Sequence, residues 1–320
     1  KLTLLDPASG SGHILVEAYD IFKEIYIERG YSSRDFPRLI LEKNLYGLDI
    51  DDRAAQMAGF ALLMKARKDD RRILQNGSPP KLNVMAIQQS DGLDAKEIAG
   101  YLLDKAMTEV SKQDIAELVE LFRHGKTFGS LITVPERLAE KLPALSEIVN
   151  SELRDGNVFA QQEAEAILPF VDQAKILARE YDCVVANPPY MGGKAMNSSL
   201  KEFATINCPD YRADLFAIFV KRIISFTHKS GNIGLMTPFT WMFLHSFEEM
   251  RRNFIYSRTL TSLIEPEYHA FFDSAFVPIC TFTLNNNHIP KYKGSFIRLT
   301  EFYSYKAQYE KTLEAINNKN

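Results

Sequence analysis

The sequence predicts an α/β fold, in which helices cover a mostly parallel sheet and a helical insertion interrupts the strand pattern. In the first part of the chain, apolar strand-like runs alternate with amphipathic helical runs, which is typical of a parallel sheet. Strand signals then stop near residue 95 and return near residue 180. With 46% hydrophobic and 25% charged residues, the chain of 320 residues has the composition of a folded globular protein.

The apolar periodicity places the individual elements. Seven strands are predicted at residues 2–6, 45–50, 82–91, 181–186, 232–238, 260–266 and 277–286. Helices are predicted at residues 14–30, 37–44, 51–68, 212–231 and 246–257. Gly30 and Gly231 are expected to end two of these helices. Residues 95–180 indicate several further helices, and the tail from residue 289 indicates one strand and one helix.

Composition excludes several classes of protein. The net charge of −3 argues against a chain that holds nucleic acid by itself, although not against an enzyme that acts on it. The three cysteines form no CxxC pair and the six histidines no HxxxH or HExxH spacing, so we expect no metal site and a reducing, cytoplasmic location. No apolar run approaches the roughly 18 residues that span a bilayer, and we expect no membrane partner and no signal peptide.

A glycine turn joins the first predicted strand to the first predicted helix. It comprises Asp6, Pro7, Ala8, Ser9, Gly10, Ser11 and Gly12. Glycines let a backbone approach a ligand closely, and a helix N-terminus offers free N–H groups. The alternative is a tight turn without a ligand. Leu15 occupies the position where a dinucleotide fingerprint has its third glycine, which disfavours a nicotinamide cofactor.

Two aspartates follow the next two predicted strands. Asp49 ends the strand at 45–50 and is expected to accept hydrogen bonds from ribose hydroxyls, with Ile50 beside it against an adenine ring. The alternative for Asp49 is a helix cap, which Asp51 and Asp52 fit better. Asp91 ends the third strand and is expected to accept a hydrogen bond from an adenine amine; its alternative is a turn former.

The motif that decides the prediction follows the strand at 181–186. It comprises Asn187, Pro188, Pro189 and Tyr190. The prolines stiffen the turn and fix its carbonyls. The Asn187 side-chain oxygen and the Pro188 carbonyl would accept the two hydrogens of an exocyclic amine, which directs the nitrogen lone pair at a methyl donor without a strong base. Tyr190 would stack on a base that has left the duplex. The alternative is a strand-ending turn with a surface tyrosine.

These motifs resemble those of the amino-methyltransferases that carry an N-P-P-Y sequence. "DPASGSGH" is similar to their motif I, "GLDID" to motif II, "SDGL" with Gly92 to motif III and "NPPY" to motif IV. The motif order, together with "GNIGLMTPFTWM", resembles the gamma class of N6-adenine DNA methyltransferases. "FFDSAFVPICTFTL" is similar to motif VIII, which places Phe272 against the flipped adenine. A narrower resemblance is to type IIG restriction-modification and BREX phage-defence (PglX-type) enzymes.

The resemblance implies a Rossmann-like, seven-stranded methyltransferase sheet, mostly parallel with an antiparallel edge strand. It implies S-adenosylmethionine (SAM) as cofactor, double-stranded DNA as substrate and other defence-system subunits as further candidate partners. The implied segments are a SAM-binding half (1–94), a helical insertion (95–180), a catalytic half (181–288) and the start of a C-terminal element (289–320). No motif X helix and no target-recognition domain is found, so we expect a catalytic-domain fragment.

Two other functions stay open at this point. One is a glutamine N5-methyltransferase acting on a release factor, which uses the same motif on an amide nitrogen. The other is a SAM-binding module of a defence complex that has no turnover. Among single residues, Lys194 is expected in a flexible loop near phosphate or simply in solvent, and Asp214 at a helix N-terminus. Trp241 and Phe243 are expected to pack in the core rather than line the base pocket.

Overall fold

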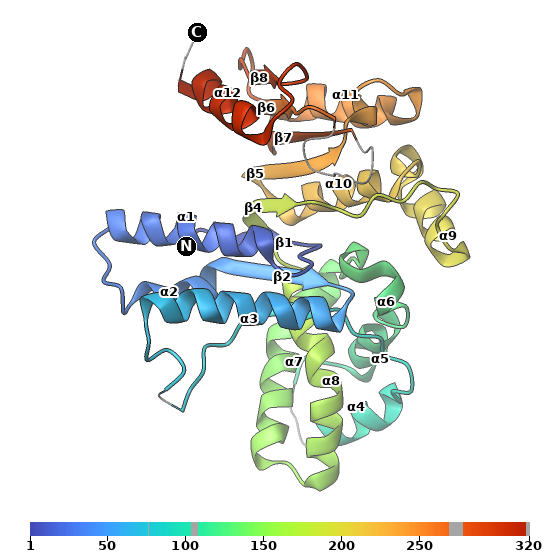
Figure 1. The fold of residues 1–320 in the computed structure, drawn as a ribbon. Helices are drawn as coiled ribbons and strands as arrows, with labels where there is room; N and C mark the ends of the chain where they lie inside the picture. The colour runs from blue at the N-terminus through green and yellow to red at the C-terminus, as the bar shows by residue number, and fades with distance from the viewer. Residues whose placement is uncertain (76, 104–107, 269–277, 318–320) are drawn as a thin grey trace. The chain divides into compact units, whose positions relative to one another are not determined.

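The computed structural model of the chain describes residues 1–75, 77–103, 108–268 and 278–317 (Figure 1). Its strands are β1 (Leu4–Asp6), β2 (Leu45–Asp49), β3 (Asn83–Ala86), β4 (Tyr181–Ala186), β5 (Thr227–Pro238), β6 (Thr259–Glu265), β7 (Ile279–Asn285) and β8 (Ser295–Arg298). Its α-helices are α1 (His13–Glu28), α2 (Phe36–Leu39), α3 (Asp52–Asp69), α4 (Ala95–Leu103), α5 (Lys112–Leu121), α6 (Gly125–Phe128), α7 (Glu136–Asp155), α8 (Val158–Leu177), α9 (Ser198–Asn207), α10 (Leu215–Phe226), α11 (Glu248–Ser257) and α12 (Tyr305–Asn317). Shorter helical turns are η1 (Ile40–Asn44), η2 (Gly129–Leu131), η3 (Pro209–Tyr211), η4 (Phe239–Met242) and η5 (His245–Phe247).

The predicted fold class is confirmed. The strands form a mixed, mostly parallel sheet in the order β3-β2-β1-β4-β5-β7-β6-β8. The sheet has eight strands rather than seven, because residues 295–298 pair in parallel with β6. The antiparallel strand β7 therefore lies between β5 and β6 instead of at the edge, which β8 occupies.

The contacts of the chain divide it into two compact units. The N-terminal unit comprises Ala8–Arg179 together with Lys1, and it contains the parallel pair β2 and β3. In the described part of residues 95–177 there are helices and turns and no strand. There α7 and α8 lie side by side (Figure 1). Leu142 and Leu145 of α7 and Val171 of α8 are almost fully buried, so apolar packing holds this helical layer together.

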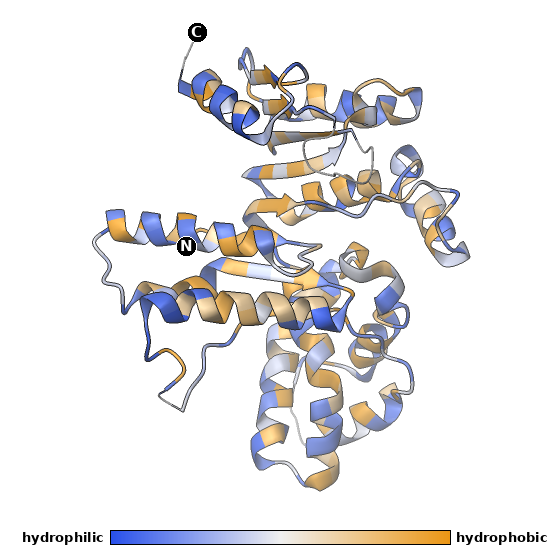
Figure 2. Ribbon diagram, in the orientation of Figure 1, coloured by the Kyte–Doolittle hydropathy of each residue, from blue (hydrophilic) through white to orange (hydrophobic). Residues whose placement is uncertain are grey.

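The C-terminal unit comprises Leu2–Pro7 and Glu180–Asn320. In it β4 pairs in parallel with β1 and β5, and β5 pairs with the antiparallel β7. Apolar residues dominate α10 (Figure 2), and most of them are buried. This helix ends at Phe226 rather than at Gly231, because Thr227 already pairs with Tyr181 and its backbone belongs to the sheet. In the described residues, no helix is long and apolar enough to cross a membrane.

Candidate active site

Between β1 and α1 the backbone makes a tight loop in which two glycines have left-handed conformations. Gly10 has φ +50° and Gly12 has φ +86°, which non-glycine residues rarely adopt. A Cβ atom on Gly12 would lie 2.7 Å from the Cβ of Ala58 in α3, so the start of α1 packs against α3 where only glycine fits. A Cβ on Gly10 would meet no atom within 4 Å, so the loop leaves open space at that position.

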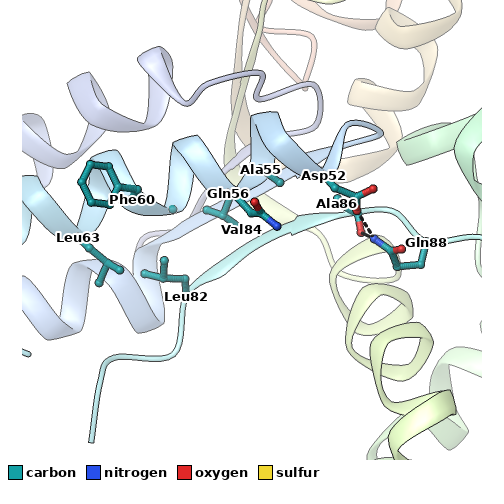
Figure 3. Close-up of a pocket in the computed structure, with 10 residues that line it drawn as sticks. Asp52, Ala55, Gln56, Phe60, Leu63, Leu82, Val84, Ala86 and Gln88 are labelled. Atoms are coloured by element: carbon teal, nitrogen blue, oxygen red, sulfur yellow. Dashed lines mark hydrogen bonds between the residues drawn. The ribbon is translucent and has the colours of Figure 1, made fainter.

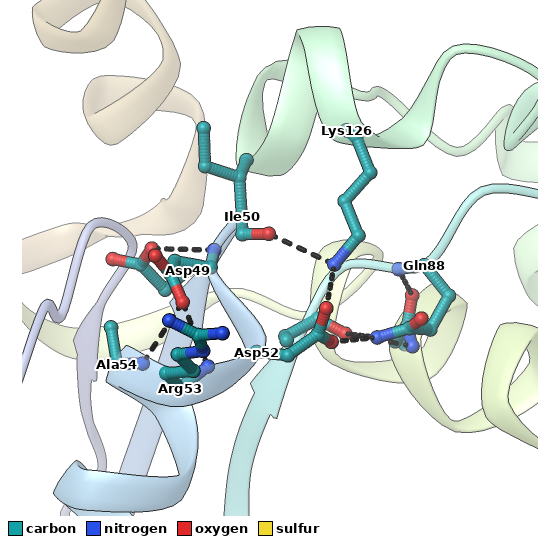
Figure 4. Close-up of polar contacts among 10 residues, drawn as sticks. Asp49, Ile50, Asp52, Arg53, Ala54, Gln88 and Lys126 are labelled. Atoms are coloured by element: carbon teal, nitrogen blue, oxygen red, sulfur yellow. Dashed lines mark hydrogen bonds and ion pairs between the residues drawn. The ribbon is translucent and has the colours of Figure 1, made fainter.

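Asp49 at the end of β2 supports this loop. Its Oδ2 accepts a hydrogen bond of 2.8 Å from the backbone N–H of Gly10. Its Oδ1, which points toward the start of α3 (Figure 4), accepts one of 2.9 Å from the backbone N–H of Asp51. Each oxygen keeps a further lone pair, so a fixed carboxylate is available to two hydroxyl donors. Asp51 caps α3 through Arg53 and Ala54, and the capping alternative for Asp49 therefore does not apply.

Two further side chains bear on whether SAM fits these residues. Ser9 is 6% exposed, and its hydroxyl has no hydrogen-bond partner in the described structure. A buried hydroxyl left without a partner costs about 1–3 kcal/mol, which a polar ligand group would offset. Ile50 is 49% exposed and offers an apolar face directly beside Asp49. A fixed carboxylate with further acceptor capacity, an exposed apolar side chain, open glycine backbone and a hydroxyl without a partner fit the adenosine end of SAM.

The other residues predicted to bind the cofactor lie at the end of β1 and in the turn that follows β3. Asp6 and Pro7 are buried at the end of β1. Strand β3 ends at Ala86, five residues earlier than predicted, because the chain turns away toward the helical insertion. Asp91 is exposed in a turn and accepts a hydrogen bond from the Gln89 amide, while Gly92 has φ +83°. The contact of Asp91 with an adenine amine stays a prediction.

The N-P-P-Y turn leaves the carboxyl end of β4. Asn187 is exposed and Pro188 is buried. The Tyr190 hydroxyl donates to Asn187 Oδ1 at 2.7 Å and lies 3.3 Å from the carbonyl of Met236 on β5. Burial raises the pKa of Tyr190 well above its ordinary value, so the hydroxyl stays protonated and remains a donor. The hydroxyl therefore orients the Asn187 amide, whose oxygen keeps a second lone pair.

Asp214 fixes the residues that follow this turn. Its Oδ1 accepts hydrogen bonds from the N–H of Phe216 at 3.2 Å, as an N-terminal cap of α10, and from the N–H of Met191 at 3.0 Å. The N–H of Leu215, the residue after Asp214, donates to the carbonyl of Met191. The position of Asp214 at the helix start was predicted, but its bond to the residue after Tyr190 was not.

Lys194 and Phe272 were the remaining predicted contacts with substrate. In the loop before Lys194, the N–H of Gly193 donates to the carbonyl of Ala213 at 3.0 Å, and the flexibility expected of this loop stays a prediction. The Lys194 side chain is exposed, and its contact with phosphate stays a prediction. Phe272 lies outside the described residues.

An aromatic cluster begins at the Tyr190 ring. This ring meets Phe216 edge-on, with centroids 6.4 Å apart, and Phe216 contacts Phe247. Trp241 packs in the core as predicted, because only 4% of its surface is exposed and its ring contacts Phe254 and Phe282. Its indole N–H donates to Cys280 Sγ at 3.3 Å. The same prediction for Phe243 is wrong, because this side chain is 64% exposed. It follows η4, and its ring meets the ring of Phe239 edge-on, with the centroids 5.5 Å apart.

Two further contributions to the site were not predicted. The Met236 carbonyl carries no sequence signal, because any residue supplies a carbonyl. Residues 125–131 of the insertion contact the end of β2, and here a signal exists: the sequence "GKTFG" places two glycines within a helical stretch, which indicates a turn. A groove between α3 and β3, lined by Phe60, Leu63 and Leu82 among others (Figure 3), contains none of the predicted site residues.

A comparison with families of known proteins matches residues 43–272 to the Eco57I restriction-modification methylase model. This match covers more than half of the chain. The chain belongs to the Eco57I restriction-modification methylase family. Both the Asp49 end of β2 and the Asn187 turn lie inside the matched region, whereas the loop that contains Gly10 and Gly12 precedes it.

Relatives of this Eco57I-family chain include two named adenine-specific methyltransferases. The chain is 42% identical to BrxX of Escherichia coli O9:H4 (strain HS), covering 94% of the chain and 26% of BrxX. It is 31% identical to PglX of Lacticaseibacillus casei (strain Zhang), covering 100% of the chain and 26% of PglX. The chain thus spans about a quarter of the length of these relatives.

A solved structure with a similar fold is a nuclease-deletion mutant of the Type ISP restriction-modification enzyme LlaGI, in complex with a DNA substrate mimic. The TM-score is 0.56 at 11% sequence identity, over 100% of this chain and 23% of LlaGI. At this identity the likeness concerns the fold alone. It supports the sheet-and-helix architecture described for this member of the Eco57I family.

Proposed function

We propose that the chain transfers a methyl group from SAM to the exocyclic N6 amine of an adenine in DNA, within a restriction-modification or phage-defence system. Membership of the Eco57I methylase family supports this, as do the names of BrxX and PglX as adenine-specific methyltransferases. The observation that carries the proposal is the exposed Asn187 at the end of β4, with its side-chain oxygen oriented by Tyr190.

In the proposed site the N-terminal unit holds the cofactor. Asp49 accepts the ribose hydroxyls, Ile50 packs on the adenine ring of SAM, and Ser9 donates its hydroxyl to a polar group of the ligand. Asp6, Pro7 and Ala8 complete the loop. When bound, SAM supplies an electrophilic methyl group on its sulfonium. The glycine backbone at Gly10 lets the ligand approach without a side chain in the way.

The catalytic turn acts on the target amine. Its nitrogen lone pair is delocalised into the ring, so the amine is a poor nucleophile. The second lone pair of Asn187 Oδ1 and the Pro188 carbonyl each accept one N–H, which favours a tetrahedral nitrogen whose lone pair is directed at the methyl group. As the N–C bond forms, the bond from the methyl carbon to the sulfonium sulfur would break and its electron pair would stay on the sulfur, which leaves a neutral thioether. The positive charge that develops on the nitrogen would be stabilised by both oxygens. One proton then leaves to water, and Tyr190 stacks on the base.

Double-stranded DNA is the proposed substrate, and its recognition is proposed to need protein outside this chain. The net charge of −3 supports this, because neutralising DNA phosphates requires a basic surface. LlaGI, which shares the fold, was solved in complex with a DNA substrate mimic, and BrxX and PglX are about four times as long as this chain. Lys194 is proposed to contact phosphate and Phe272 the flipped base.

The test is methyl transfer from labelled SAM to an adenine-containing duplex. Asn187→Ala should abolish transfer, on the order of a thousandfold or more, while SAM binding survives, because removing one positioned group at the reacting atom costs several kcal/mol. The matched control is Asn197→Ala, which removes the cap of α9 in the same unit and should leave the rate within about twofold. Wild-type rates from Asn187→Ala, or labelling of a release factor but not of DNA, would overturn the proposal.

A further inference from the structure

A short segment of the helical insertion contacts the turn that joins β2 to α3. This contact segment is Gly125–Leu131, formed by α6 and η2. Its Lys126 ammonium donates to the main-chain carbonyl of Ile50 at 2.9 Å and to Asp52 Oδ2 at 2.9 Å (Figure 4). One side chain from the insertion therefore binds both residues flanking Asp51, in the turn that joins β2 to α3.

Glycines bring the backbone of the contact segment against both parallel strands. Gly129 has φ +53°, and a Cβ there would lie 2.6 Å from Cγ2 of Ile50. A Cβ on Gly125 would lie 1.9 Å from the carbonyl oxygen of Gln88, just beyond β3. A heavy-atom approach this close excludes any larger residue without displacement of its neighbour. The Ile50 side chain thus rests directly on the Gly129 backbone.

Hydrogen bonds from Gln88 link the start of α3 to helix α8. The Gln88 side chain donates to Asp52 Oδ1 at 2.7 Å, and the Gln88 N–H donates to Gln173 Oε1 at 2.9 Å. Gln173 lies in α8 and is 2% exposed. Hydrogen bonds from Gln88 and Lys126 lower the pKa of Asp52, so its carboxylate is charged at neutral pH and the ion pair with Lys126 persists.

We propose that the contact segment is a wall of the pocket for the adenine end of SAM, in which Lys126 fixes the Ile50 main chain and Gly129 sets the position of its side chain. Ile50 follows the proposed ribose acceptor Asp49 directly and has half of its surface exposed. Its exposed half receives the ring, and Gly129 supports it from behind. The insertion is thereby a positioning element for the cofactor. This inference rests on the proposed function.

The first test compares two glycine substitutions at positions where φ is positive. Gly129→Ala and Gly30→Ala each place a Cβ on a residue with positive φ, but a Cβ on Gly30 meets nothing within 4 Å. In calorimetric titrations with SAM, Gly129→Ala should weaken binding at least tenfold, because the new methyl displaces Ile50. Gly30→Ala should bind SAM within about twofold of the wild type.

The second test removes the lysine contact without changing the backbone. Lys126→Met should weaken SAM binding about fivefold or more, whereas Lys81→Met, which loses an ion pair with Asp172 in the same unit, should not. Hydrogen exchange of the Ile50 and Asp52 amides should accelerate in Lys126→Met alone. If Gly129→Ala fails to fold, the comparison of SAM affinity between Lys126→Met and Lys81→Met tests the proposal.

The outcomes separate this inference from the function on which it rests. If the wild-type protein binds SAM and Lys126→Met binds it as tightly as Lys81→Met does, the proposal that the contact segment is a pocket wall is overturned. The methyltransferase proposal is unaffected by that result. A folded wild-type protein that binds no SAM overturns the cofactor assignment and the wall together. Free methionine in place of SAM should show no difference between the variants, because it lacks the adenine.

Discussion

Replacing Asp214 by alanine should affect methyl transfer more than it affects stability. One oxygen of this carboxylate caps α10 at Phe216 and also accepts the N–H of Met191, the residue after Tyr190. Its loss removes one of the hydrogen bonds that hold the chain immediately downstream of the catalytic turn. The prolines Pro188 and Pro189 restrain only the upstream part of the turn.

The magnitude follows from the two hydrogen bonds. Loss of an N-terminal cap costs about 1 kcal/mol. A hydrogen bond to a charged group contributes about 1.5–3 kcal/mol when buried, but Asp214 is only partly buried and water replaces some of it, so we take about 1 kcal/mol for the Met191 bond. Asp214→Ala should therefore cost about 2 kcal/mol in unfolding free energy. Asn197→Ala, which removes only the cap of α9, should cost about 1 kcal/mol.

The assay is methyl transfer from labelled SAM to duplex DNA, with urea unfolding measured in parallel. A shift of the turn by about 1 Å corresponds to roughly a hundredfold loss of rate, so Asp214→Ala should lower kcat between tenfold and a hundredfold without changing KM for SAM. Asp214→Asn keeps the acceptor oxygen and should retain most of the activity. The reasoning is refuted if Asp214→Ala and Asn197→Ala have equal rates, or if exchange of the Met191 amide is unchanged.

Two further predictions concern the glycine loop and alkaline pH. Gly12→Ala should destabilise the protein by about 1–3 kcal/mol more than Gly30→Ala in urea unfolding, because only the former places a methyl 2.7 Å from the Cβ and 2.9 Å from the Cα of Ala58. Equal destabilisation by the two substitutions would contradict the steric account. Burial raises the pKa of Tyr211 to about 12, against about 10 in an unfolded chain. Its contribution to stability is therefore complete below pH ~10 and is lost as pH rises toward ~12. Between pH 9 and 11.5 the free energy of unfolding, measured with urea, should fall by about 2 kcal/mol less in Tyr211→Phe than in the wild type. Equal decreases in the two proteins would exclude Tyr211 as the cause.

The sequence predicted the parts of the fold that local pattern determines. Strand and helix periodicity gave the seven main strands, and the short apolar run before "NPPY" placed Asn187 at the end of β4 as found. The eighth strand was expected only as a strand in the tail, because nothing local shows which partner residues 295–298 choose. The end of α10 was misplaced for a similar reason: Thr227 joins the sheet by pairing with Tyr181, a long-range contact that overrides local helix signals.

The candidate site divides in the same way. The positions of Asp49 and Asn187 at the ends of strands could be predicted, because apolar strand patterns are visible in the sequence, and their proposed roles stay predictions. The hydroxyl bond from Tyr190 and the second acceptor role of Asp214 depend on side-chain geometry that no spacing reveals. Lys126 was missed because a lysine in a helical stretch usually faces solvent, and only the fold brings it to the Ile50 carbonyl.

The chain's one tryptophan gives a spectroscopic reporter of a single part of the molecule. Trp241 is buried among Phe254, Phe282 and the Cys280 thiol, all in the C-terminal unit. Its emission should shift to longer wavelength when that unit opens, whereas far-UV circular dichroism also weighs the long helices α7 and α8 of the other unit. Denaturation curves from the two signals should coincide if the units melt cooperatively and separate if they do not.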